Sequence, residues 1–249
     1  ISMKKVTIVT VLIMSFSLVL ISFTKASRID ETAIKAKVSV NTPDSSIVEN
    51  ESVESLASSM YTNLNLDGLG LSFEPLKYAI NGYNKLDEMG KVNNQFLTIV
   101  DFSQSSRKKR LYIIDMKNQQ LVWNTFVSHG KNSGVDMATK FSNEYNSEAS
   151  SLGFYITTAT YRGKHGTSLR LSGQEQGFNN NAEGRGVVVH GADYVNAGRV
   201  NSAYMGRSQG CPALPMAEYS KIINIIKGGS VMFIYHPTQK YLNNSELIG

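Results

Sequence analysis

The sequence contains a single cysteine, Cys211, in a setting that favours nucleophilic chemistry. A histidine, His190, ends an apolar run earlier in the chain. A thiol attacks a carbonyl as the thiolate, and a neighbouring imidazole is the usual group that takes its proton. Gly210 allows a close approach of the backbone, so N–H groups around the cysteine could hold the oxyanion of a tetrahedral intermediate. These residues predict a nucleophile, Cys211, with His190 as its base.

A lone cysteine also has structural interpretations. It cannot form an internal disulfide, so it could link two copies of the chain or be a buried bystander. The glycine and proline on either side of Cys211 argue against a position in a core strand. A zinc site built from Cys211, His129, His165 and His190 matches no familiar ligand spacing. We therefore expect no metal and no other cofactor.

The surrounding sequence predicts the elements that position the pair. A strand predicted at 186–190 carries His190 at its end, and a helix predicted over about 215–227 follows Cys211. The N-terminus of that helix would favour a thiolate. Hydrophobic periodicity predicts further elements, namely helices near 52–62 and over about 72–88 and strands at 96–102, 111–115, 121–128, 153–158, 167–171 and 230–235. Together they indicate a mainly β domain of the α+β type.

Residues 1–26 predict an export segment. A basic start and an uncharged apolar run from Val6 to Phe23 precede small residues of the kind that a signal peptidase recognises. The run is also long enough to span a bilayer, so an uncleaved membrane anchor remains the alternative. Residues 27–51 are polar and predict a linker. The catalytic domain would then occupy residues 52–249, and its place would be the periplasm or cell envelope.

The charge of the chain argues against nucleic-acid binding. The formal net charge is +5, but residues 27–249 carry 22 basic and 20 acidic side chains, which leaves almost no excess. The main basic cluster is the run Arg107-Lys108-Lys109-Arg110. It lies between two predicted strands and indicates a solvated turn, with contact to an anionic wall or membrane as the alternative.

The residues around the Cys–His pair resemble the L,D-transpeptidase (YkuD-type) family. The family signature is a strand-terminal His-Gly followed by Ser-x-Gly-Cys, and one branch, the murein L,D-transpeptidase catalytic domains, has the form Ser-x-Gly-Cys-Pro-Ala found here from Ser208 to Ala213. The commonest family form has histidine in place of Gln209, and arginine or asparagine in place of Ala213. Other segments shared with the branch include Asp101-Phe102-Ser103, Ser128-His129-Gly130-Lys131-Asn132-Ser133-Gly134, Phe141-Ser142-Asn143, Ser150-Ser151-Leu152-Gly153 and Tyr161-x-Gly163-Lys164-His165-Gly166.

The resemblance covers about residues 52–248 and implies both a fold and a set of roles. The fold is a β-sandwich-like catalytic domain with N-terminal helices and one helix after the catalytic cysteine. Cys211 attacks a peptidoglycan stem peptide, His190 activates it, and the carbonyl of Gly191 orients the imidazole. Ser208 and Gly210 shape the turn that carries the nucleophile, and the family uses no cofactor.

Several residues are candidates for substrate binding. Arg207 could pair with a substrate carboxylate or with an acid in a loop. His129 and His165 could line the cleft or hydrogen-bond their own loops, and Tyr161 could form part of a lid or pack against a neighbour. The full set of candidates is Ser208, Arg207, Gln209, His129, His165 and Tyr161.

The reaction implied by the resemblance is acyl transfer through a cysteine acyl-enzyme. The donor is a tetrapeptide stem, and an amine acceptor from a neighbouring stem gives a 3–3 crosslink. Family members also accept carbapenems as acylating agents. Two alternatives remain, an L,D-carboxypeptidase that uses water as the acceptor and a catalytically silent wall-binding protein. Peptidoglycan stem peptides are the expected partner, and the oligomeric state is not predicted.

Overall fold

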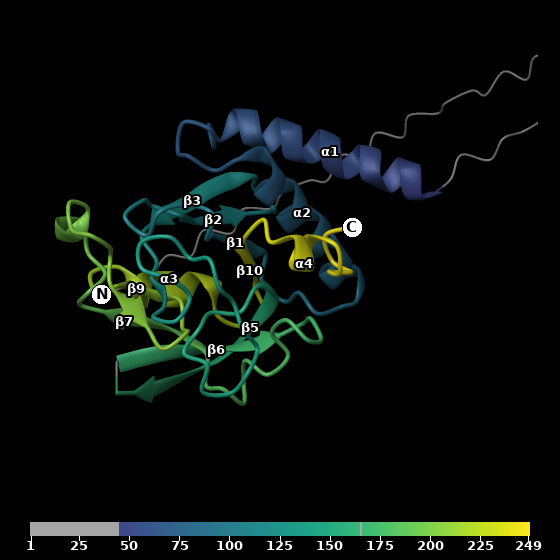
Figure 1. Ribbon diagram of the computed structural model, residues 1–249. Coiled ribbons are helices and arrows are strands. Elements are labelled where there is room, and N and C mark those ends of the chain that lie inside the picture. Colours follow the sequence, from purple (N-terminus) through teal and green to yellow (C-terminus); the bar gives the residue numbers. More distant parts are fainter. Residues whose placement is uncertain (1–44, 165) are drawn as a thin grey trace, which may run out of the picture. The chain divides into compact units, whose positions relative to one another are not determined.

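The computed structural model describes residues 45–164 and 166–249 (Figure 1). The predicted export segment, most of the predicted linker and His165 lie outside the described residues. Within the described part of the chain, no helix combines the length and the apolar character needed to cross a membrane.

The domain is built on one mixed eight-stranded sheet. Its strands are β1 (Phe96–Asp101), β2 (Leu111–Asp115), β3 (Gln120–Thr125), β5 (Gly153–Gly163), β6 (Gly166–Gly173), β7 (Val188–Ala192), β9 (Ala213–Pro215) and β10 (Val231–Tyr235). Their order across the sheet is β3-β2-β1-β10-β5-β6-β7-β9. The pairs β1–β10 and β7–β9 are parallel and the others are antiparallel. Two short parallel strands, β4 (His129–Gly130) and β8 (Arg207–Ser208), form a separate sheet.

Two of the helices pack directly on the main sheet. The helices are α1 (Ser45–Asn63), α2 (Phe73–Glu88), α3 (Tyr219–Ile226) and α4 (Gln239–Leu242), with a 3₁₀ turn at Ala197–Arg199. The α2 helix packs on α1, β1 and β10, whereas α3 packs on β1, β6 and β7 (Figure 1). Every residue of β10 is buried, as expected for a strand covered on both faces.

Most of the sequence predictions of the fold are confirmed. The domain is mainly β, with helices at its start and a helix after Cys211. The helix predicted over 72–88 is α2, whose apolar side chains recur at helical spacing and are buried. The α1 helix begins ahead of the predicted residues 52–62.

The helix predicted over about 215–227 is present but begins later than predicted. The segment Ala213–Pro215 instead forms β9, which pairs in parallel with β7 and places Ala213 opposite His190. The α3 helix begins only at Tyr219. Along the chain, β9 therefore lies between Cys211 and the N-terminus of α3.

Candidate active site

Cys211 lies at a cavity of about 340 Å³. Its side chain is partly buried, and its sulfur accepts a hydrogen bond from the backbone N–H of Val188 at 3.5 Å. The thiol in turn faces the carbonyl oxygen of Gly186 at 3.8 Å. Both partners belong to the chain that leads into β7, so the first residues of this strand fix the position of the sulfur. The residues that line the cavity are Asn146, Glu148, Arg185, Gly186, Val187, Gln209 and Cys211.

The surroundings of the thiol act on its pKa in opposite directions. Burial raises the pKa of Cys211 above its ordinary value. The N–H of Val188, the positive charge of Arg185 and the cysteine's own N–H each lower the pKa and offset part of that effect. The resting group is therefore a thiol that needs a base to remove its proton when it attacks.

His190 is buried at the sheet position next to the nucleophile segment. It belongs to β7, and its Cα is paired with that of Ala213, two residues beyond the cysteine. Its Nδ1 lies 2.9 Å from the carbonyl oxygen of Gly191. A carbonyl oxygen can only accept, so Nδ1 carries a proton, and in the neutral form of the ring the lone pair then lies on Nε2.

Gly191 has a packing reason to be glycine. A Cβ at this position would lie 2.6 Å from the sulfur of Met216 and 2.7 Å from the ring of Tyr219. Any side chain would push these residues away from β7. The His-Gly dipeptide therefore has two functions. The Gly191 carbonyl orients the His190 ring, and the missing side chain of Gly191 lets Met216 and Tyr219 pack closely on β7.

A tight turn from Ser208 to Cys211 presents the nucleophile. The hydroxyl of Ser208 donates to the carbonyl of Cys211 at 2.6 Å and accepts the N–H of Gly210 at 3.0 Å. Gly210 has φ +118°, and a Cβ there would lie 2.8 Å from the carbonyl oxygen of Ala149. Because the N–H of Gly210 is engaged by Ser208, the N–H of Cys211 is the better candidate for holding an oxyanion.

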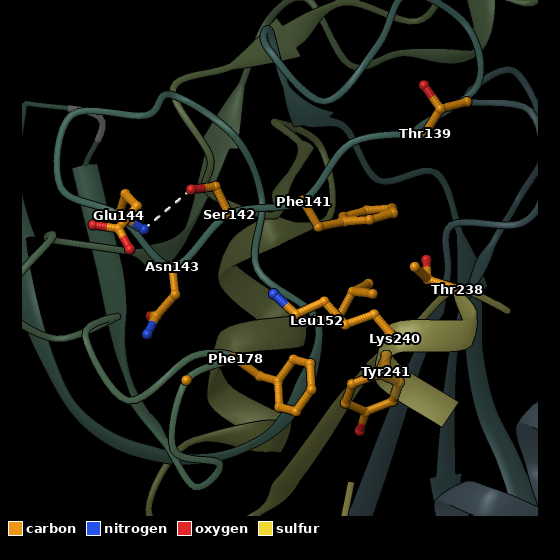
Figure 2. Close-up of a pocket in the computed structure, with 11 residues that line it drawn as sticks. Thr139, Phe141, Ser142, Asn143, Glu144, Leu152, Phe178, Thr238, Lys240 and Tyr241 are labelled. Carbon is orange, nitrogen blue, oxygen red and sulfur yellow. Dashed lines mark hydrogen bonds between the residues drawn. The ribbon is translucent and has the colours of Figure 1, made fainter. Parts of the chain in front are cut away.

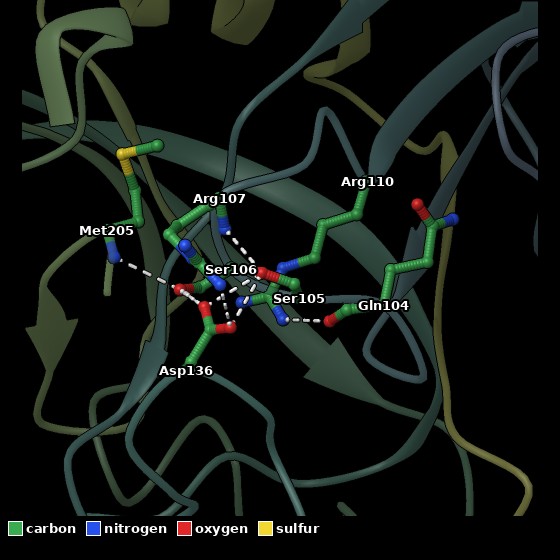
Figure 3. Close-up of polar contacts among 7 residues, drawn as sticks. All are labelled: Gln104, Ser105, Ser106, Arg107, Arg110, Asp136 and Met205. Atoms are coloured by element: carbon green, nitrogen blue, oxygen red, sulfur yellow. Dashed lines mark hydrogen bonds and ion pairs between the residues drawn. The ribbon is translucent and has the colours of Figure 1, made fainter. Parts of the chain in front are cut away.

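The segment before this turn is tied to a distant hairpin through a polar cluster (Figure 3). The N–H of Met205 donates to the hydroxyl of Ser106 at 3.0 Å, and that hydroxyl donates to Asp136 at 2.8 Å. Asp136 also pairs with Arg107 at 3.1 Å and accepts from Ser105. Burial alone would raise the pKa of Asp136, but these hydrogen bonds lower it to about 2. The cluster fixes the chain just ahead of β8.

The basic run is a solvated turn over its first three residues, which are exposed, but its last residue, Arg110, is buried. Arg110 is fully buried, because its guanidinium donates to the carbonyls of Val127 at 3.0 Å and Gln104 at 2.8 Å. Its Nη2 also donates to Nδ1 of His129 at 2.8 Å, and the group lies 4.7 Å over the ring of Phe102. Burial lowers the pKa of Arg110 to about 9. Figure 3 shows Arg110 beside the Ser106–Asp136 cluster.

Three of the other candidates for substrate binding do not line the cavity. His129 is buried against Arg110, and burial together with that charge lowers the pKa of His129 to about 4. Arg207 donates to the carbonyls of Lys131 at 3.1 Å and Gly134 at 3.2 Å. Tyr161 is exposed, and the guanidinium of Arg170 in β6 stacks 4.7 Å from the centre of its ring. Of this set, Gln209 alone lines the cavity, Ser208 supports the turn, and His165 lies outside the described residues.

Sequence reasoning missed three residues of the cavity wall. Arg185, Glu148 and Asn146 all line it with Cys211. Glu148 pairs with Lys131 at 2.7 Å, which leaves Arg185 as the cation that acts on the thiol. The only sequence signal for Arg185 is its position just ahead of the apolar strand that ends in histidine.

A second cavity of about 260 Å³ is lined in part by other residues of the segment from 139 to 152 (Figure 2). It is lined by the rings of Phe141, Phe178 and Tyr241 and by Ser142 and Asn143. Residues of the segment from 139 to 152 therefore line both cavities, but Cys211 lines only the first. Across residues 45–164 and 166–249, no three His, Cys, Asp or Glu side chains are grouped so that they could hold a metal ion.

The solved structures similar to the chain include an L,D-transpeptidase from Mycobacterium smegmatis, with 15% identity, coverage of 57% of this chain and 59% of that chain, and a TM-score of 0.36. An L,D-transpeptidase from Stackebrandtia nassauensis has 13% identity, coverage of 67% and 68%, and a TM-score of 0.35. L,D-transpeptidase 3 from Mycobacterium tuberculosis, solved with a faropenem-derived adduct, has 13% identity, coverage of 57% and 60%, and a TM-score of 0.35.

The family is established by sequence. The chain spans about 59% of the length of the Mycobacterium smegmatis protein. No curated protein matches its sequence. The model of the L,D-transpeptidase catalytic domain matches residues 68–235, which include His190, Gly191 and Cys211. Since this match covers more than half of the chain, the protein belongs to the L,D-transpeptidase catalytic-domain family.

Proposed function

We propose that the chain is a peptidoglycan L,D-transpeptidase that forms an acyl-enzyme on Cys211 with tetrapeptide stems and transfers the acyl group to an amine. The observation that carries this proposal is the position of the thiol. Its sulfur lies at the N–H of Val188, at the edge of a cavity, and the same strand holds His190 with its ring bound to the Gly191 carbonyl. The family membership supports the choice of substrate.

In the first step, His190 takes the proton of the Cys211 thiol through Nε2. The sulfur then attacks the carbonyl carbon of the third stem residue, and the C–S bond forms while the carbonyl electrons move to oxygen. The N–H of Cys211 is placed to donate to this oxyanion. The intermediate collapses by breaking the C–N bond to the terminal D-alanine. The imidazolium of His190 gives its proton to the departing amine.

In the second step, the amine of a neighbouring stem loses a proton to His190 and attacks the thioester carbonyl. A new amide C–N bond forms and the C–S bond breaks. The sulfur leaves as a thiolate, which regains a proton from the imidazolium. The product is a 3–3 crosslink, and no cofactor takes part in either step.

The proposed reaction belongs outside the cytoplasm, where crosslinked stems are found. The support for this location is the basic, apolar and small-residue pattern of residues 1–26. Either a cleaved signal or a retained anchor would deliver the domain to the periplasm or cell envelope.

The test is incubation of the purified protein with disaccharide-tetrapeptide muropeptides, followed by chromatography and mass spectrometry. We expect crosslinked dimers that have lost one D-alanine, and no product from Cys211→Ala. Tripeptide monomers alone would instead identify an L,D-carboxypeptidase. Unchanged muropeptides with folded wild-type protein would support a catalytically silent wall-binding protein.

A further inference from the structure

Arg185 lies directly against the nucleophile turn. It occupies the chain just before β7, and its side chain lines the cavity together with Cys211. Its Nη2 lies 3.6 Å from the position that a Cβ on Gly210 would take. The guanidinium is therefore packed beside the backbone of residue 210, next to the reacting sulfur.

Four acceptors on one loop use the terminal N–H groups of this arginine. Nη1 donates to the carbonyl of Ser142 at 2.8 Å and to the hydroxyl of Ser151, and Nη2 donates to the hydroxyl of Ser147 at 2.9 Å and the carbonyl of Ala149 at 2.7 Å. A guanidinium has five N–H donors, so only Nε–H is left over. Arg185 consequently lacks the pair of free donors that a bidentate contact to a substrate carboxylate requires.

Among the described residues, Arg185 forms no ion pair with a carboxylate. All four of its acceptors are neutral. Glu148, which lines the same cavity, is paired with Lys131. The other titratable groups that act on the pair are Glu144, Tyr145 and Tyr155 near Arg185 and Tyr194 near Cys211. The arginine and the cysteine favour each other's charged forms.

We propose that Arg185 is a positioning residue for the Cys211 reaction, which holds the segment from 142 to 151 as one wall of the cavity and stabilises the thiolate through its charge. The inference rests on the proposed function for the identity of the acyl group. The interaction between Arg185 and the sulfur can be measured without any peptidoglycan substrate.

The test is the pH dependence of alkylation by iodoacetamide in the full-length chain. Cys211 is the single cysteine, so the rate reports this thiol alone. We expect Arg185→Gln to raise the midpoint of the pH profile by about one unit and to slow alkylation at pH 7 about tenfold. Arg185→Lys keeps the charge and should restore most of the midpoint. Arg162→Gln, which removes an exposed arginine of β5 outside the cavity lining, should leave it unchanged.

Three results would overturn the inference. The first is a folded Arg185→Gln protein with the wild-type midpoint, and the second is an equal shift in Arg162→Gln. Should Arg185→Gln not fold, Arg185→Met provides a second neutral variant. The third result is a failure of both neutral variants to fold while Arg185→Lys folds, which would assign the arginine to stability alone. If wild-type protein does not turn over muropeptides, but Arg185→Gln still shifts the alkylation midpoint as expected, the result counts against the proposed function and not against this inference.

Discussion

The hydroxyl of Ser208 offers the sharpest test of how the nucleophile is held. This side chain is buried, and it makes two hydrogen bonds within the turn, to the carbonyl of Cys211 at 2.6 Å and from the N–H of Gly210 at 3.0 Å. Ser208→Ala would leave both partners without the hydroxyl. Each unsatisfied buried group costs about 1–3 kcal/mol. Because the cysteine is only partly buried and water can reach it, we expect a total loss of about 2–3 kcal/mol.

Urea unfolding of the substrate-free protein measures this loss. With a slope of about 2–3 kcal/mol/M, the midpoint should fall by about 1 M. The rate of acylation by a carbapenem should fall as well, since the turn no longer fixes the sulfur. Ser220→Ala, at an exposed position of α3, is the matched control and should change stability by less than about 0.5 kcal/mol. A Ser208→Ala protein that unfolds at the wild-type urea concentration would refute the turn assignment and favour a contact to substrate.

Three further predictions concern the support of the site. Gly210→Ala places a Cβ 2.8 Å from the carbonyl of Ala149 at φ +118°, so thermal unfolding should show a loss of about 1–3 kcal/mol. His129 has a pKa of about 4 when folded, below the ordinary value of about 6.5. Its contribution to the free energy of unfolding is therefore complete above about pH 6.5 and is lost as the pH falls to about 4. This loss amounts to about 3 kcal/mol; urea titrations across that range measure it, and His129→Gln should flatten the slope. Asp136→Ala removes the acceptor of Ser106 and Arg107, and we expect slower acylation by a carbapenem with a stability loss of about 1–3 kcal/mol. If the variant and the wild type are acylated at equal rates, this cluster does not help to position the nucleophile turn.

The longer helices and strands could be predicted from sequence because the pattern of apolar residues in each of them is long enough to identify its type. The α2 helix buries Leu76, Ala79, Ile80 and Leu86 at helical spacing. The strands β2 and β10 and the first half of β5 are mostly apolar and buried, and in β1 a single threonine interrupts the apolar run. The short strands β4, β8 and β9 have two or three residues each, and such lengths leave no periodic pattern. The helix predicted over about 215–227 begins too early for that reason, because Ala213–Pro215 forms β9.

The candidate site could be predicted only where it depends on local sequence. The Cys211 turn and the His190–Gly191 carbonyl contact each involve residues within a few positions of one another. Arg185 depends on carbonyls and hydroxyls that only the folded segment from 142 to 151 brings to it. Arg110 is buried because the carbonyls of Val127 and Gln104 satisfy its N–H groups, and nothing in a basic run indicates such partners.

The most direct test of the Cys–His mechanism is intact-mass measurement after incubation with a carbapenem. We predict one adduct on the wild-type protein, none on Cys211→Ala, and acylation of His190→Ala slower by about 10²–10⁴-fold. His236→Ala, which alters a histidine packed on Phe141 in the second cavity wall, should acylate close to the wild-type rate. An adduct that persists in Cys211→Ala, or a His190→Ala protein that acylates as fast as wild type, would contradict the account.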